Sequence, residues 1–181
     1  MSETPSANLP AVLLDAARRA IEENRAAGLR VAVAESCTGG LVSAALTEIA
    51  GCSDVFEAGF VTYANEAKQA MLGVPEDVLG TFGAVSVATA WAMAQGVLRK
   101  TGADIGVAIT GIAGPGGGTE KKPVGTVVFA RATRSGDPED VVADTKLFDD
   151  DGRSGIRLQA ALCALELLLP SPATADPAEA P

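Results

Sequence analysis

Histidine is absent from the 181 residues of this chain. Its absence excludes a Ser-His-Asp triad, a Cys-His dyad, a histidine general base and a histidine-ligated zinc site. An enzyme with this sequence therefore has to activate its nucleophile by another side chain.

Cysteine is also scarce, with only Cys37, Cys52 and Cys163, far apart in the sequence. An odd, widely spaced set is typical of reduced thiols and not of a disulfide framework. The polar N-terminus has no signal-peptide pattern, and no apolar run approaches the ~18–20 residues of a membrane helix. We therefore expect a cytoplasmic protein with no membrane partner.

Positive charge is in the minority, because 14 Lys and Arg stand against 23 Asp and Glu, for a net charge of −9. This balance argues against binding to nucleic-acid backbones, which needs clustered basic residues. The 48% hydrophobic content supports a packed core, and the length suits one domain. We predict a folded domain over residues 11–169, between a disordered leader (1–10) and a disordered tail (170–181).

Helical spacing and short apolar runs alternate along this domain. We expect helices that begin near residues 13, 41, 65, 85 and 156, and strands at 30–35, 56–63, 104–110, 124–133 and 141–148. The last two strands are predicted to be antiparallel. The order predicts a single-domain α/β fold, a three-layer α/β/α sandwich with a mixed, partly parallel sheet. In such folds the site usually lies beyond the carboxyl ends of the strands.

The sequence ESCTGG (residues 35–40) lies where a predicted buried strand turns into a helix. Ser36, Cys37 and Thr38 bring two hydroxyls and a thiol to a helix start, whose free amides can bind an anion or an oxyanion. Gly39 and Gly40 allow a ligand to approach the backbone. The alternative interpretation is an ordinary helix cap followed by a tight turn.

A second candidate segment contains Tyr63, the only tyrosine, followed by Asn65 and Lys68. If Asn65 caps the helix, Lys68 lies at the third helical position, where the helix dipole and burial lower a lysine pKa. A neutral lysine can serve as the base for a serine hydroxyl, and Tyr63 could relay or orient a proton. The alternative is a solvated helix lysine beside a core aromatic.

Two further segments have the composition of a phosphate site. The glycine-rich loop 111–118 fails the Walker A pattern, because Gly117 and Gly118 stand where Lys and Ser or Thr belong. As a flexible, donor-rich loop with Lys121 and Lys122 beyond it, it suits a phosphate or polar substrate, or it is only a connector. At the start of the last helix, three aspartates lack the spacing of a calcium loop, so we expect no metal there. We expect a capped helix start from which Arg153 projects toward a phosphate.

Taken together, the motifs resemble one family, the CinA C-terminal domain family. The resemblance covers residues from about Leu13 to Leu169. It is carried, in order, by AESCTGG, GFVTYANEAK, MLGVP, GAVS, AITGIAGPGGG and KPVGTV.

The resemblance implies an α/β/α domain that hydrolyses the carboxamide of nicotinamide mononucleotide to nicotinate mononucleotide and ammonia, without a cofactor. It implies that Ser36 is the nucleophile, that Tyr63 and Lys68 activate it, and that Thr110 supplies a further active-site hydroxyl. We expect the substrate to be bound by Thr38, Gly39, Gly40, Gly111, Gly114, Gly116, Gly117 and Arg153. A homodimer is expected, since small α/β enzymes of this kind often pair.

The sequence departs from the family pattern at three places. Phe82 and Val87 stand where the family often has His and Glu around GAVS, and the family's Gly-Asp-Arg motif reads Asp-Gly-Arg before and at Arg153. Two alternatives stay open. Cys37, at a predicted helix start, is a rival nucleophile. The domain could also be a non-catalytic nucleotide-binding or regulatory module.

Overall fold

The structure is a computed structural model, and it describes residues 9–136, 142–149 and 151–170. Its centre is a five-stranded sheet in the order β2-β1-β3-β4-β5. The strands are β1 (Val31–Glu35), β2 (Phe56–Val61), β3 (Ile105–Gly111), β4 (Thr126–Thr133) and β5 (Val142–Leu147).

The sheet is mixed. β1 pairs in parallel with β2 and β3, whereas β4 and β5 are antiparallel to their neighbours. Glu35 at the end of β1 is in register with Val61 of β2 and Ile109 of β3. The carboxyl ends of the three parallel strands therefore meet at one edge of the sheet, where α/β folds usually place their sites.

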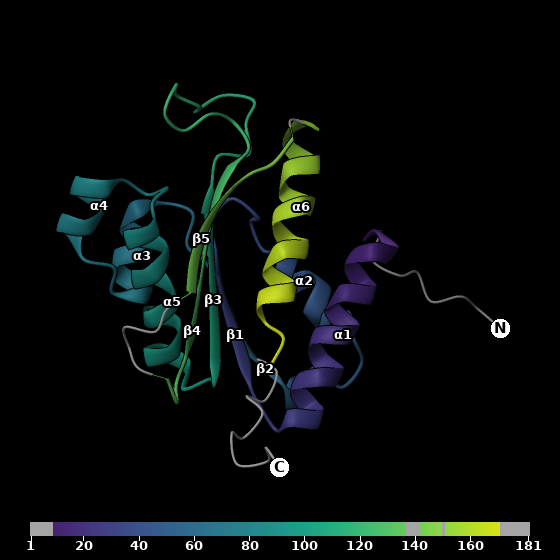
Figure 1. Ribbon diagram of the computed structural model, residues 1–181. Helices are drawn as coiled ribbons and strands as arrows, with labels where there is room; N and C mark the ends of the chain where they lie inside the picture. Colours follow the sequence, from purple (N-terminus) through teal and green to yellow (C-terminus); the bar gives the residue numbers. More distant parts are fainter. Residues whose placement is uncertain (1–8, 137–141, 150, 171–181) are drawn as a thin grey trace, which may run out of the picture.

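Helices cover both faces of the sheet, so the predicted three-layer sandwich is confirmed (Figure 1). The helices α1 (Ala11–Ala27), α2 (Leu41–Thr47) and α6 (Gly152–Leu167) lie on one face. The other face carries α3 (Asn65–Leu72), α4 (Glu76–Phe82) and α5 (Val87–Thr101).

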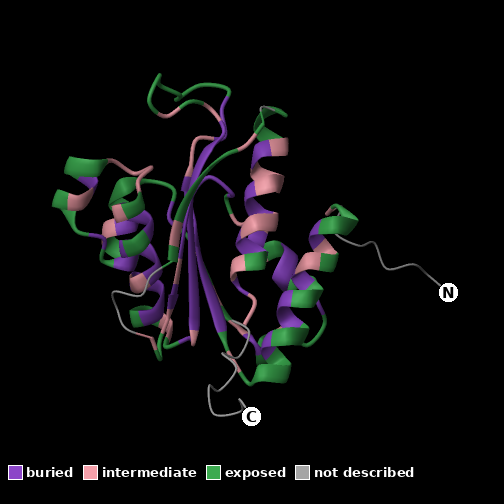
Figure 2. Cartoon of the chain, in the orientation of Figure 1, coloured by how far each residue is buried: buried purple, intermediate pink, exposed green. Residues whose placement is uncertain are grey.

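The alternating side chains of the strands divide the core into two clusters. Val31 and Val33 of β1 pack in the cluster under α1, α2 and α6, whereas Ala32 and Ala34 pack in the cluster under α3, α4 and α5. β1 is buried along its whole length, as Figure 2 shows for the central strands. Its carboxyl end is therefore held rigidly from both faces.

Several element ends differ from the sequence-based expectation. The helix that begins at Leu41 ends at Thr47, and a 3-10 helix (Cys52–Asp54) follows instead of further α-helix. α4 was not expected from the sequence. Asn65 is the first residue of α3 and makes no cap, because Ala64 occupies the N-cap position. Lys68 therefore lies at the fourth helical position and not at the third.

The predicted leader and tail lie almost entirely outside the described residues, which exclude 1–8 and 171–181. Leu9, the first described residue, packs against the core beside α1. Within the described part of the chain, no helix is both long and apolar enough to span a bilayer.

Candidate active site

Ser36 follows directly on β1, at the carboxyl edge of the sheet. Its amide donates to the carbonyl of Ile109 on β3 (2.9 Å), which extends the parallel pairing by one residue. The side chain is mostly buried, with 8% of the residue exposed. Ser36 is therefore fixed by the sheet, although it lies in a turn.

Lys68 of α3 lies against Ser36. Its ammonium nitrogen is 3.1 Å from Ser36 Oγ, 2.8 Å from the carbonyl oxygen of Thr62 and 3.2 Å from that of Tyr63. Only 1% of Lys68 is exposed, and no described carboxylate forms an ion pair with it. A fully buried lysine with neutral partners is uncommon, because its charge is not compensated.

Burial lowers the pKa of Lys68 below its ordinary value of 10.5. In the neutral amine, two N–H bonds suffice for the carbonyls of Thr62 and Tyr63, and the remaining lone pair can accept the Ser36 proton. The contact set therefore fits a general base that acts directly on Ser36.

Thr110 is brought to the same edge, one residue beyond the Ile109 that binds the Ser36 amide. It is 1% exposed, and its hydroxyl donates to the carbonyl of Ala84 (2.8 Å). This bond joins the end of β3 to the GAVS segment that precedes α5. Thr110 therefore lies next to Ser36 in the fold, with its hydroxyl proton already bound.

Tyr63 and Arg153 meet at the rim of this site. Arg153 donates to the Tyr63 hydroxyl (2.9 Å) and to the Gly114 carbonyl (2.7 Å), so one guanidinium of α6 joins the segment after β2 to the glycine loop. The Tyr63 side chain is 58% exposed, and among the described contacts its hydroxyl touches neither Ser36 nor Lys68. The proposed relay through Tyr63 is therefore not the arrangement observed, since Lys68 contacts Ser36 directly.

The backbone of the Ser36–Gly40 turn is largely committed to its own hydrogen bonds. The Gly39 amide donates to the Ser36 carbonyl (3.1 Å) and the Gly40 amide to the Glu35 carboxylate (3.0 Å). These two amides are therefore not available for an oxyanion, contrary to expectation. Thr38 is fully buried, and its hydroxyl has no partner among the described residues.

The glycine loop rises from this edge beside the start of α6 (Figure 1). A Cβ at Gly111 or at Gly114 would collide with β4 or with Val124, so packing within the loop requires these two glycines. Gly116 and Gly117 are exposed and open, so they are free to face a substrate. Lys122 does not project freely, because it donates to the carbonyls of Val85 (2.7 Å) and Phe82 (3.3 Å).

Two residues of the site were missed by sequence reasoning. Glu35 is fully buried, and its carboxylate binds the turn and the start of α2. An acidic residue at the end of an apolar strand was the available signal, since buried carboxylates need partners. Arg157, one helical turn after Arg153, donates to the Thr38 carbonyl (2.7 Å). Its spacing of four residues from Arg153 placed both on one helix face.

Cys37, the rival nucleophile, is buried and 5% exposed. Burial raises the pKa of its thiol to about 11, although the amides of Cys37 and Thr38 favour the thiolate. The neutral thiol is a poor nucleophile. The environment of Cys37 therefore opposes the catalytic role that its place before a helix suggested.

Metal ligands do not converge anywhere in the described part of the chain. Asp151 occupies the N-cap position of α6 but its side chain makes no cap bond, contrary to the predicted capped start, and Asp150 lies outside the described residues.

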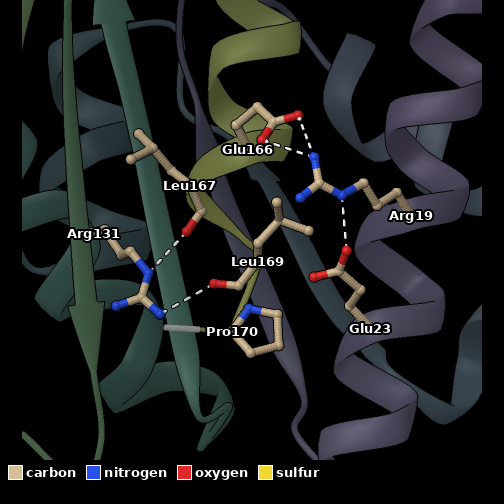
Figure 3. Close-up of a pocket in the computed structure, with 7 residues that line it drawn as sticks. All are labelled: Arg19, Glu23, Arg131, Glu166, Leu167, Leu169 and Pro170. Atoms are coloured by element: carbon tan, nitrogen blue, oxygen red, sulfur yellow. Dashed lines mark hydrogen bonds and ion pairs between the residues drawn. The ribbon is translucent and has the colours of Figure 1, made fainter. Parts of the chain in front are cut away.

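A cavity of about 470 Å³ lies at the far end of α6, away from Ser36 (Figure 3). In it Arg19 pairs with Glu23 and Glu166, while Arg131 donates to the carbonyls of Leu167 and Leu169. These contacts tie the end of α6 to α1 and β4. Because Arg19 and Arg131 are already bound to neighbouring residues, we interpret this cavity as a structural feature that lies outside the candidate active site.

Two curated relatives of this chain differ in length. A CinA-like protein of Akkermansia muciniphila is 52% identical over 141 residues, but the match covers 78% of this chain and only 33% of that protein. A nicotinamide-nucleotide amidohydrolase PncC of Escherichia coli is 50% identical over 144 residues, covering 80% of this chain and 85% of that protein. The chain thus spans about a third of the longer relative and most of the shorter one.

Solved structures of similar proteins have the same fold as this chain. The crystal structure of the competence/damage inducible protein CihA from Agrobacterium tumefaciens superposes with a TM-score of 0.84 at 50% identity, covering 90% of this chain and 96% of that one. The sequence profile of the CinA C-terminal domain matches residues 14–171. The chain therefore belongs to the CinA C-terminal domain family.

Proposed function

We propose that this domain hydrolyses the carboxamide of nicotinamide mononucleotide to nicotinate mononucleotide and ammonia. The observation that carries the proposal is the buried Lys68 amine, 3.1 Å from Ser36 Oγ and without a carboxylate partner. The choice of substrate follows the E. coli relative, whose name gives a nicotinamide-nucleotide amidohydrolase and of which the chain covers 85%.

In the first step, Ser36 Oγ attacks the carboxamide carbon while neutral Lys68 takes the hydroxyl proton. A C–O bond forms and the carbonyl oxygen becomes an oxyanion.

In the second step, the protonated Lys68 returns its proton to the leaving nitrogen, the C–N bond breaks and ammonia departs. Water then attacks the acyl-enzyme with Lys68 again as base, which releases the carboxylate product and restores Ser36. One buried lysine thus supplies both the base and the acid that a histidine supplies in other serine hydrolases.

We assign the binding of the ribose phosphate to Arg153 and to the open glycines Gly116 and Gly117. Arg153 is exposed, has no carboxylate partner among the described ion pairs, and retains donors beyond its bonds to Tyr63 and Gly114. In this proposal Tyr63 holds Arg153 in place and does not move a proton.

Ammonia release from nicotinamide mononucleotide, nicotinamide and NAD tests the proposal. We expect release from the mononucleotide, and a kcat/KM for nicotinamide at least about 100-fold lower, because nicotinamide lacks the phosphate. Binding of the mononucleotide without ammonia release would contradict the proposal and favour the non-catalytic, nucleotide-binding alternative.

A further inference from the structure

Glu35 is the one acidic side chain among the fully buried residues of the described chain. It closes β1, immediately before Ser36, and is 0% exposed. No described Lys or Arg forms an ion pair with it. A buried carboxylate is tolerated only when hydrogen-bond donors surround it, so its donors identify its role.

All of its donors come from the segment that follows Ser36. One carboxylate oxygen accepts from the amides of Gly40 (3.0 Å) and Val42 (3.1 Å). The other accepts from the amide (2.8 Å) and the hydroxyl (2.7 Å) of Ser43. The amides at a helix start normally lack partners, and here the carboxylate of Glu35 supplies them.

These and two further hydrogen bonds restrain the backbone of the turn on both sides of Ser36. Glu35 lies on one side of the turn and Gly40 on the other, so the Glu35–Gly40 bond fixes the span that carries Ser36. The Ser36 amide is bound to Ile109, and the Thr38 carbonyl is bound by Arg157 (2.7 Å). Ser36 Oγ can therefore reach Lys68 in only a narrow range of positions.

We propose that Glu35 is a positioning residue that holds Ser36 at its distance from Lys68, without itself taking or giving a proton. The inference rests on the proposed serine nucleophile. A displacement of about 1 Å at a reacting atom can cost about 10²-fold in rate, so the loss of this carboxylate is expected to appear in the reactivity of Ser36.

The test compares Glu35→Gln with Ser43→Ala. Glutamine keeps the size of Glu35, but its NH₂ group faces amide donors and removes acceptors from the turn. Ser43→Ala removes only the hydroxyl bond and leaves both ends of the turn tied. The readout is the rate at which a fluorophosphonate labels Ser36, since phosphorus takes the serine oxygen and fluoride leaves, with no need for the natural substrate. Thermal unfolding confirms that each variant is folded during labelling.

We expect Glu35→Gln to slow labelling about 10- to 100-fold and to lower kcat for ammonia release by a similar factor, with KM within about twofold. Ser43→Ala should stay within about threefold of the wild type. The inflection of the pH–rate profile should not move, because burial and not Glu35 lowers the pKa of Lys68. A purely structural role for Glu35 would lower thermal stability without slowing labelling.

Wild-type labelling by folded Glu35→Gln would overturn the inference. Should Glu35→Gln not fold, Glu35→Asp replaces it, since aspartate keeps the charge but withdraws both oxygens from the turn. Wild-type labelling by folded Glu35→Asp would then overturn the inference.

If the wild type is labelled at Ser36 but releases no ammonia from nicotinamide mononucleotide, the proposed substrate is wrong and the labelling rates still decide the role of Glu35. If Ser36→Ala is labelled as fast as the wild type, the nucleophile and Glu35 fail together.

Discussion

Lys68 connects the composition of the chain to its chemistry at the scale of single residues. A chain without histidine needs another base, and the fold buries this amine beside Ser36 with only neutral partners. The desolvation that makes the charged form costly is also what keeps the amine available as a base. The same side chain would be inert as a base if it were solvated, because its pKa would then be near 10.5.

The dependence of activity on pH follows from this environment. Lys68 acts as a base only when neutral, and burial lowers its pKa below 10.5, so kcat/KM should rise with pH and level off below pH 10.5. Measurement of kcat/KM between pH 6 and 10.5 checks this, with Lys68→Arg as the inactive control, since arginine stays protonated. A rate that still rises steadily up to pH 10.5, without levelling off, would contradict the assignment.

Cys37 is expected to be dispensable. Its buried thiol has a pKa raised to about 11, so the reactive thiolate is scarce at neutral pH. Cys37→Ala should retain ammonia release within about threefold, and iodoacetamide should leave the wild type active. A loss of 100-fold or more in a folded Cys37→Ala protein would return the nucleophile role to the thiol.

Close packing between elements explains glycines that a sequence alone cannot interpret. Gly96 lies inside α5, where a Cβ would collide with the backbone and side chain of Leu72 on α3. Gly80 lies inside α4, with nothing within 4 Å of the same position. Both are helix-interior glycines with ordinary φ, so their local helix propensities are alike.

We therefore predict opposite effects from the same substitution. Gly80→Ala should raise the free energy of unfolding by about 0.5–1 kcal/mol through helix propensity. Gly96→Ala should lower it by about 1–3 kcal/mol, because α3 has to move away from α5. Urea denaturation of both variants measures the difference, and equal shifts would show that the α3–α5 contact does not decide the effect. Because α3 carries Lys68, we expect Gly96→Ala to lower ammonia release as well.

The elements themselves were largely predictable, and the exceptions have physical causes. All five strands, the mixed sheet and the antiparallel pairing of the last two strands followed from apolar runs and turn residues, whereas the antiparallel pairing of β3 with β4 was not predicted. α4 was missed because it has only seven residues and one buried side chain, Leu79. The prediction that Asn65 caps the helix was wrong. Ala64, in extended conformation, occupies the N-cap position, and Asn65 is already the first helical residue.

At the scale of the whole molecule, the sequence indicated which edge of the sheet carries the candidate residues, but not the contacts between them. Ser36 and Thr110 lie together because the parallel strands β1 and β3 end at one edge, and α3 then brings Lys68 against Ser36. The direct Lys68–Ser36 contact and the use of Tyr63 to hold Arg153 depend on side-chain directions that no spacing specifies. The four bonds of Glu35 likewise require the turn and the start of α2 to be placed together.

Burial of Lys68 also links the stability of the whole domain to pH. The pKa of Lys68 is lower in the folded than in the unfolded chain, so between these two values the unfolded chain binds more protons. The free energy of unfolding should therefore rise with pH in that interval, by at most about 1.4 kcal/mol per pH unit, relative to Lys68→Met. Urea denaturation of both proteins from pH 7 to 10 measures the slope, and parallel curves would contradict a depressed pKa.

The central claim is that Ser36 and Lys68 together cleave the carboxamide of nicotinamide mononucleotide. The direct measurement is kcat/KM for ammonia release by the wild type, Ser36→Ala, Lys68→Ala and the control Lys100→Ala, which removes an exposed lysine. We predict that kcat/KM falls by about 10²–10⁴-fold in Ser36→Ala and in Lys68→Ala, and that Lys100→Ala stays within about twofold of the wild type. Near-normal turnover by folded Ser36→Ala or Lys68→Ala would contradict the account.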